Sequence, residues 1–212
     1  MNWYRKSAEQ NDASAQRNLG WMYLHGRGIP QSDLEAIKWY RKSAEQNNAR
    51  AQFALGWIYK NGRGVVQSDL EAVKWYRKSA EQNNIHAQHG LGEMYQQGRG
   101  VSQSYTEALT WYKKSAKQNP LSAFALGVFF DEAWVVKEDK IMAYCLQSMG
   151  INQITKNADL PQSFKTECYE RFDRLGQKLS TADIRKATIL RATFKSDESL
   201  MDNLLNSLVE LS

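Results

Sequence analysis

The chain has 212 residues, of which 42% are hydrophobic and 24% charged, and its formal net charge is +5. This length allows one continuous core, and the composition is ordinary for a globular protein. No apolar run approaches the roughly 20 residues that cross a bilayer, which argues against a membrane span. Two cysteines, Cys145 and Cys168, are too few for a disulfide framework, and this favours a reducing compartment.

The first residues, NWYRKSAEQN, match the middle of later segments rather than their beginning. We therefore expect the first structural unit to be truncated at its N-terminus. The open half-unit would expose Trp3 and Tyr4 and offer an end-to-end contact between copies. A leader peptide could have been removed with the missing half. The cytoplasm, or delivery as an effector, is favoured as the location, and the periplasm or secretion stays open.

From this start onward, several residue types recur at a fixed interval of 36 residues. Self-similarity at a period of roughly 20–50 residues is typical of stacked repeat proteins. The recurring residues are the tryptophans Trp3, Trp39, Trp75 and Trp111, the glycines Gly20, Gly56 and Gly92, and the tyrosines Tyr23, Tyr59 and Tyr95.

Each repeat predicts a hairpin of two helices. In the first, RAQFALGWIYKNG at 50–62, the helical spacing ends at Gly62, which can adopt the left-handed conformation cheaply. Gly56 lies inside this helix, where glycine costs about 1 kcal/mol relative to alanine. We therefore expect an aromatic side chain of a neighbouring helix to lie against it. The second helix follows a GRG loop and begins after a capping box, Ser32-x-x-Glu35, Ser68-x-x-Glu71 or Ser104-x-x-Glu107.

These motifs resemble the Sel1-like repeat, a bacterial relative of the tetratricopeptide repeat. The matching features are Ala-Gln-x-x-Leu-Gly-x-x-Tyr, the Gly-x-Gly loop, Asp-x-x-Ala and Trp-Tyr-x-x-Ser-Ala, and they cover residues 3–120 closely. The resemblance implies an all-α fold, an α-solenoid of helix hairpins, and we expect a C-terminal helical cap because the open end of a solenoid needs covering. We expect the solenoid over 1–150, with three clear units and a degenerate fourth, and the cap or extension over 151–212.

The C-terminal part reads as helices without the repeat. One helix is expected from the spacing of Phe164, Cys168, Phe172, Leu175 and Leu179, and the next begins at Ser180-x-x-Asp183. A last helix would carry Leu200, Leu204, Leu208 and Leu211 on one side. A cap over the open end of the solenoid is the preferred interpretation. A partner-binding or dimerising tail is the alternative, so that homo-oligomers could form through either end of the chain.

The motif Trp-Tyr-Arg-Lys could bind nucleic acid, because aromatic rings stack on bases and cations pair with phosphates. Residues 1–120 also carry 17 lysines and arginines against 10 acidic residues. However, the helical phase turns Tyr40 toward the core. It turns Lys38 and Arg41 toward solvent. Lys38 lies three residues after Glu35 and Arg41 lies four before Glu45, which are spacings at which exposed helix charges pair. We therefore interpret the aromatics as structural and the cations as a solvated, partly paired face, and we expect no nucleic-acid partner.

No catalytic motif is visible, and no cofactor is expected. The GRG sequence lacks the lysine and the strand of a phosphate-binding loop, so a helix-to-helix turn is the better interpretation. His86, His89 and Glu93 share one helical face and form the best metal candidate. The preceding repeat has Arg50, Phe53 and Trp57 at these positions, and three side chains on one helix rarely complete a metal shell, so no metal site is predicted.

That same face of the first helices changes chemically from repeat to repeat. The resemblance places first helices along a concave groove, where exposed tryptophan beside arginine is typical of an interface centre. The alternative is that these aromatics pack onto adjacent first helices. The predicted partner-binding residues are Arg17, Trp21, Arg50, Phe53, Trp57, Lys60, His86, His89, Glu93 and Phe124.

The leading hypothesis for function is a non-catalytic scaffold that binds another protein or peptide in this groove. The resemblance implies roles such as a bacterial virulence factor, an adaptor or a toxin-immunity protein. Cysteine-rich relatives suggest a β-lactam-binding or β-lactam-hydrolysing enzyme as an alternative, but their paired cysteines and a Ser-Lys nucleophile motif are missing here. A basic-surface nucleic-acid binder is the third hypothesis, and it predicts strongly salt-dependent binding.

Overall fold

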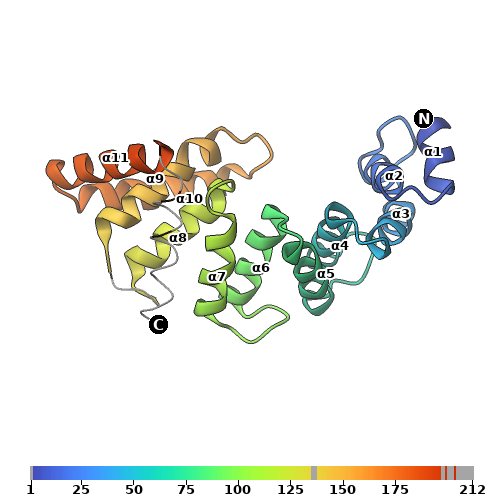
Figure 1. The fold of residues 1–212 in the computed structure, drawn as a ribbon, viewed down its shortest axis with the longest axis horizontal. Coiled ribbons are helices and arrows are strands. Elements are labelled where there is room, and N and C mark those ends of the chain that lie inside the picture. The colour runs from blue at the N-terminus through green and yellow to red at the C-terminus, as the bar shows by residue number, and fades with distance from the viewer. Residues whose placement is uncertain (1, 135–137, 197–198, 200–202, 204–212) are drawn as a thin grey trace. The chain divides into compact units, whose positions relative to one another are not determined.

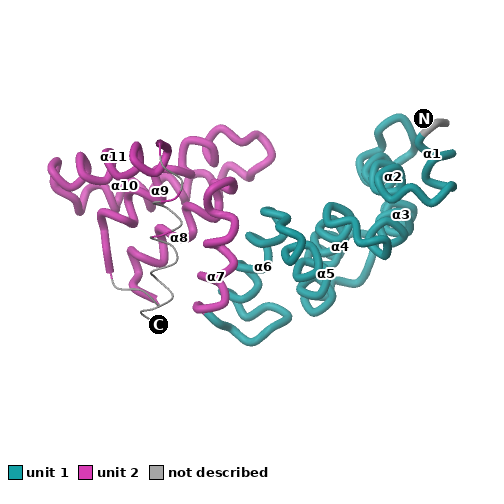
Figure 2. The backbone as a smooth tube through the Cα atoms, viewed as in Figure 1, with its two compact units in different colours: residues 1–104 teal, residues 105–212 magenta. Residues whose placement is uncertain are grey.

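The computed structural model describes residues 2–134, 138–196, 199 and 203. These described residues form eleven α-helices and no strand, which confirms the all-α prediction (Figure 1). They fall into two compact units, residues 1–104 and 105–212, which are described separately (Figure 2).

Unit 1 is a row of helices in which each helix packs against the next one in sequence. The 36-residue period therefore corresponds to one hairpin, formed by α2 and α3 or by α4 and α5. Tyr4 on α1 is exposed, as expected, whereas the side chain of Trp3 lies outside the described residues. The helices are α1 (Asn2–Glu9), α2 (Ala13–His25), α3 (Asp33–Glu45), α4 (Ala49–Asn61), α5 (Asp69–Glu81) and α6 (Ile85–Gln97).

Local capping fixes the ends of these helices where the sequence motifs predict. The hydroxyl oxygens of Ser32 and Ser68 accept hydrogen bonds from the backbone at the starts of α3 and α5. Gly62 ends α4 with a φ of 64°, in the left-handed region that glycine adopts without strain. The helices α2, α4 and α6 begin after side-chain caps that the sequence analysis missed, namely Asp12, Asn48 and Asn84.

The glycines inside the first helices provide room for tyrosine rings. A Cβ on Gly20 would lie 3.0 Å from the Tyr40 ring, and one on Gly56 would lie 2.5 Å from the Tyr76 ring. Both rings belong to the second helix of the same hairpin and are buried. The expected aromatic contact is therefore confirmed at these two glycines.

Buried glutamines connect successive helices. The amide of Gln52 donates to the carbonyl of Ala44 and to the side-chain oxygen of Asn47, both at 3.1 Å, and accepts a hydrogen bond from Gln82 at 2.7 Å. Asn47 has a φ of 66°, so it turns the chain between α3 and α4 while accepting this bond. The same contacts recur one repeat earlier, where Gln16 takes the place of Gln52.

In unit 2, α9 is the central helix and packs against α8, α10 and α11. Helix α9 runs through residue 150, so the expected boundary between solenoid and cap falls inside a helix. That the repeats end near residue 150 stays a prediction. The predicted helices after residue 160 are confirmed as α10 and α11, and the expected helix through Leu200–Leu211 lies outside the described residues. The helices are α7 (Tyr105–Ser115), α8 (Pro120–Glu132), α9 (Lys140–Lys156), α10 (Gln162–Gln177) and α11 (Thr181–Ser196).

The hairpin α8–α9 keeps one feature of the repeat in altered form. Gly127 faces α9 as Gly56 faces α5, but a Cβ there would meet Gln147 at 2.6 Å instead of a tyrosine ring. Gln147 is fully buried, and its amide has no hydrogen-bond partner among the described residues. The contact between glycine and a tyrosine ring, seen at Gly20 and Gly56, is therefore replaced here by a contact with a glutamine side chain, and a degenerate fourth repeat stays a prediction.

Candidate functional site

The Trp-Tyr-Arg-Lys motif makes contacts inside the repeat row. Arg41 donates a hydrogen bond to the hydroxyl of Tyr59 at 2.9 Å, and Arg77 makes the equivalent bond to Tyr95. The expected pairing of Arg41 with Glu45 is therefore wrong, because the guanidinium reaches forward to the next first helix. Trp39 is buried, and the Lys42 ammonium lies 4.7 Å from its ring centroid.

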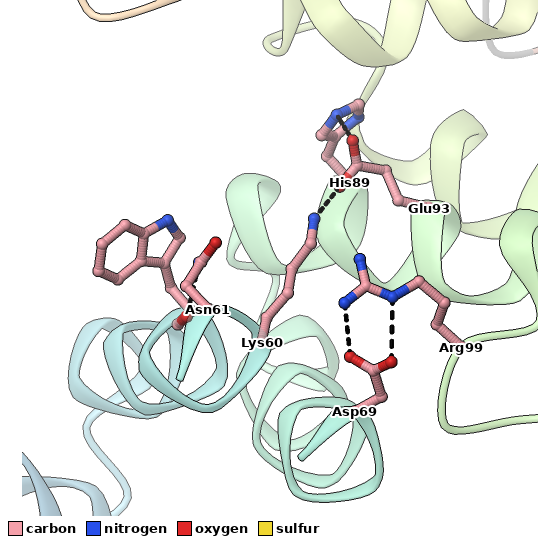
Figure 3. A network of polar contacts seen from close by, with 7 residues as sticks. Lys60, Asn61, Asp69, His89, Glu93 and Arg99 are labelled. Atoms are coloured by element: carbon pink, nitrogen blue, oxygen red, sulfur yellow. Dashed lines mark hydrogen bonds and ion pairs between the residues drawn. The ribbon is translucent and has the colours of Figure 1, made fainter. Parts of the chain in front are cut away.

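The GRG loop also ties neighbouring repeats together. Arg99 forms two hydrogen bonds with the carboxylate of Asp69 at 3.0 and 2.7 Å (Figure 3). One repeat earlier, Arg63 bonds Asp33 and donates to the carbonyl of Leu24. The interpretation of GRG as a turn between helices is confirmed, and the arginine adds a link to the preceding repeat that the sequence analysis missed.

Two tryptophans of the predicted binding face are exposed. Trp21 on α2 and Trp57 on α4 lie 36 residues apart and leave 44% and 38% of their surface accessible. The Trp21 ring packs on His25 at a centroid distance of 4.7 Å, and the Arg63 guanidinium lies 5.9 Å from the Trp57 ring. Arg50 is exposed, whereas Arg17 is half-buried and its Nε has no partner among the described residues.

Phe53 joins α4 to its neighbours in unit 1. It is half-buried, and its ring lies 5.8 Å from the centroid of Tyr76 and 5.7 Å from that of His86. The alternative, that the aromatics of this face pack onto adjacent first helices, thus holds in part for Phe53. The side chains of Trp21 and Trp57 remain partly exposed to solvent.

On α6 the same face carries an ion cluster. The Lys60 ammonium donates to a carboxylate oxygen of Glu93 at 2.6 Å, and His89 Nε2 lies 3.6 Å from the other oxygen (Figure 3). Burial would raise the pKa of Glu93, but hydrogen bonds and charge from His89 and Lys60 outweigh it and lower this pKa to about 2. Burial, with His89 as a second cause, lowers the pKa of His86.

The contacts in this cluster engage residues of the metal candidate, His86, His89 and Glu93, with other side chains. Glu93 is bonded to Lys60, and His86 contacts the Phe53 ring instead of joining the carboxylate. Among the described residues, no group of three potential ligands is placed to hold a metal ion.

Phe124 is the member of the predicted set that the structure contradicts. It belongs to unit 2, is only 7% exposed and lies in a cluster with Val128, Ile151 and Cys168. Helix α10, which the earlier repeats lack, contributes Cys168 to this cluster, and α9 contributes Ile151. Phe124 is therefore a core residue of unit 2 rather than part of a binding face.

Hairpins that recur every 36 residues and pack in a row define the class of α-solenoid proteins. The Sel1 repeat model matches residues 1–12, 13–48, 49–84 and 85–120, and the chain belongs to this family. Sel1 repeats mediate protein–protein interactions, and proteins built from them are generally non-catalytic scaffolds. No helix in the described part of the chain combines the length and apolar character needed to span a membrane.

Solved structures similar to this chain include the following two. A Sel1 repeat protein from Oxalobacter formigenes is 35% identical, with a TM-score of 0.64 over 76% of this chain and 65% of its own. The protective antigen c5321 from uropathogenic Escherichia coli shares the fold at 24% identity and a TM-score of 0.57, over 99% of this chain and 50% of its own. This chain thus spans about two thirds of the length of the first protein and half of the length of the second. No curated protein matches it.

Proposed function

We propose that the chain is a scaffold that binds a protein partner on the face formed by Trp21, Arg50, Phe53 and Trp57, here called the tryptophan face. The observation that carries this proposal is the exposure of Trp21 and Trp57 at equivalent positions of successive repeats. Trp39, which belongs to the repeated core motif, is buried in the same unit.

The energetics of the tryptophan face favour burial by a partner. A tryptophan side chain left half in water keeps apolar area exposed, and covering it stabilises a complex by about 25 cal/mol per Å². Tryptophan and arginine are also the residue types that dominate binding energy at interface centres. Arg50 supplies a cation beside this apolar surface, so an acidic or aromatic group of the partner would find a complementary contact there.

The ion cluster on α6 sets the polar edge of the same surface. Lys60 and Glu93 neutralise one another, so the side chains at this edge offer hydrogen bonds more than net charge. We expect the partner to place its apolar anchor against α2 and α4 and its polar groups toward α6. This arrangement of an apolar centre with a polar rim is usual for protein interfaces.

Site-specific photo-crosslinking in the native host tests the proposal. A benzoylphenylalanine at position 57 or at position 21 should capture the same partner. At position 70 it should not, because the exposed Leu70 lies outside the tryptophan face. Equal capture from position 70, or different partners from positions 21 and 57, would rule the proposal out.

Alanine variants then separate binding from folding. Trp57→Ala should weaken binding of the captured partner by about 2 kcal/mol or more, as at interface hot spots, and should destabilise the fold by less than Trp39→Ala does, because Trp57 is the more exposed of the two. Trp39→Ala removes the same side chain from the core and should destabilise the fold by about 3–5 kcal/mol. Virulence factor, adaptor and toxin-immunity protein are the roles proposed for such a scaffold, and the identity of the captured partner decides among them.

A further inference from the structure

A cavity of about 290 Å³ lies within unit 2, and none of its described lining residues belongs to the tryptophan face. Its walls come from α9, α11, the turn between α7 and α8, and the first turn of α8. The apolar part of its lining includes Met149 and the buried Phe194. The size is at the lower end of the range for ligand sites, so it suits a single side chain or a similarly small group.

The charged side chains among the described lining residues are all basic. Lys117, Arg191 and Lys195 line it, and none of the described lining residues is acidic. Residues 105–212 as a whole hold 14 lysines and arginines and 14 aspartates and glutamates, so an excess of cations is not the background of this unit. Arg191 and Lys195 at one cavity favour an anionic ligand, and a guanidinium such as that of Arg191 matches a carboxylate with two parallel hydrogen bonds.

The remaining lining residues narrow the class of ligand. Gln118, Asn152 and Gln153 carry amides that donate and accept hydrogen bonds, as a peptide backbone requires. An inorganic anion would leave the apolar wall of Met149 and Phe194 unused, whereas the methylene groups of a glutamate side chain would cover it. We propose that this cavity binds an acidic side chain of a peptide, with Arg191 and Lys195 as its carboxylate partners.

Methionine methyl NMR on the full chain tests this proposal directly. The Met149 methyl reports on the cavity, and Met22 and Met94 in unit 1 serve as internal references. The probe is the peptide acetyl-Leu-Glu-Glu-Leu-amide, and the matched control replaces both glutamates by glutamine. We expect the acidic peptide to shift the Met149 signal saturably while the reference signals stay in place, and the glutamine peptide to shift none of them.

Charge-neutral variants identify the partners. Arg191→Gln and Lys195→Gln should each raise the Kd for the acidic peptide about tenfold or more. Lys178→Gln makes the same change of net charge at an exposed residue outside the cavity and should leave the Kd within about twofold. Lys195 is exposed, so its variant keeps the test valid if Arg191→Gln unfolds the chain.

Four results would overturn the assignment. An unmoved Met149 signal would show that the cavity does not take the peptide. An equal shift with the glutamine peptide would remove the role of the carboxylates. Inorganic phosphate binding as tightly as the acidic peptide would reduce the cavity to a simple anion site. Equal weakening by Lys178→Gln would assign the binding to general charge attraction. None of these outcomes bears on the tryptophan face, which is tested separately by crosslinking.

Discussion

Gly56→Ala is the substitution for which the structure and simple helix propensity disagree most. Alanine is favoured over glycine inside a helix by about 1 kcal/mol, so propensity alone predicts a more stable protein. In the structure, however, a Cβ at this position would lie 2.5 Å from one ring carbon of Tyr76 and 2.7 Å from another. Real Cβ atoms essentially never come so close, so the ring or the helix must move.

The surroundings of Tyr76 leave its ring little room to move. Gly90 on α6 faces the opposite edge of the ring, where a Cβ would already lie 3.2 Å away, and Phe53 stacks on it. Forcing extra atoms into a packed site of this kind costs about 1–3 kcal/mol. We therefore expect Gly56→Ala to lower stability by about 1–2 kcal/mol after the propensity gain. Gly20→Ala should leave stability nearly unchanged, because its Cβ would lie 3.0 Å from the Tyr40 ring.

Urea denaturation followed by far-ultraviolet circular dichroism measures this difference. Repeat proteins can unfold in stages, so transition midpoints are compared between variants at equal slope. The cause is tested by combining Gly56→Ala with Tyr76→Leu, because the penalty of the alanine should shrink once the ring is gone. A midpoint for Gly56→Ala at or above that of the parent chain would refute the argument.

Three further predictions follow from the polar contacts. Gln52→Leu should lower the free energy of unfolding in urea by about 1–3 kcal/mol, since it leaves the buried carbonyl of Ala44 without its side-chain donor. Arg99→Lys should lower the melting temperature slightly, by an amount equivalent to about 0.5–1 kcal/mol, because lysine cannot form the two parallel bonds to the partly exposed Asp69. The folded state lowers the pKa of Glu93 to about 2 from its ordinary 4.5. Glu93 thus adds stability at pH values above 4.5, and this stability is lost as the pH falls toward 2. Glu93→Gln should therefore make the urea midpoint depend less on pH between 4.5 and 2.

Much of unit 1 could be predicted from the sequence because its contacts are local and repeated. The left-handed Gly62 and the serine cap at Ser32 are decided within one turn of a helix. The contact of Gly56 with an aromatic ring could be predicted because glycine inside a helix needs a packing reason. Because the motifs repeat every 36 residues, each prediction for one hairpin also applies to the next.

The long-range polar contacts were missed because the helical phase of a single segment does not reveal its partners. Arg41 looked like a solvated cation, yet its partner Tyr59 lies 18 residues further on, in the next hairpin. The buried Gln52 could have been found, because a glutamine recurs at this position on the core side of α2, α4 and α6. Phe124 was misplaced because the helical phase cannot show that Ile151 on α9 and Cys168 on α10 form a core with it.

The division between fixed and variable positions has a physical origin in the repeat contacts. The ring of Tyr76, the amide of Gln52 and the guanidinium of Arg77 each bind a partner on another helix, so changing one of them requires a compensating change there. Trp57 is 38% exposed and its indole lies 5.9 Å from the Arg63 guanidinium, so its position is less constrained by the hairpin stack than that of the buried Tyr76 ring. Glu93 stands at that position on α6, paired with Lys60, within an undisturbed hairpin row. A scaffold of this construction can therefore alter what it binds, repeat by repeat, while the helices that hold the face stay the same.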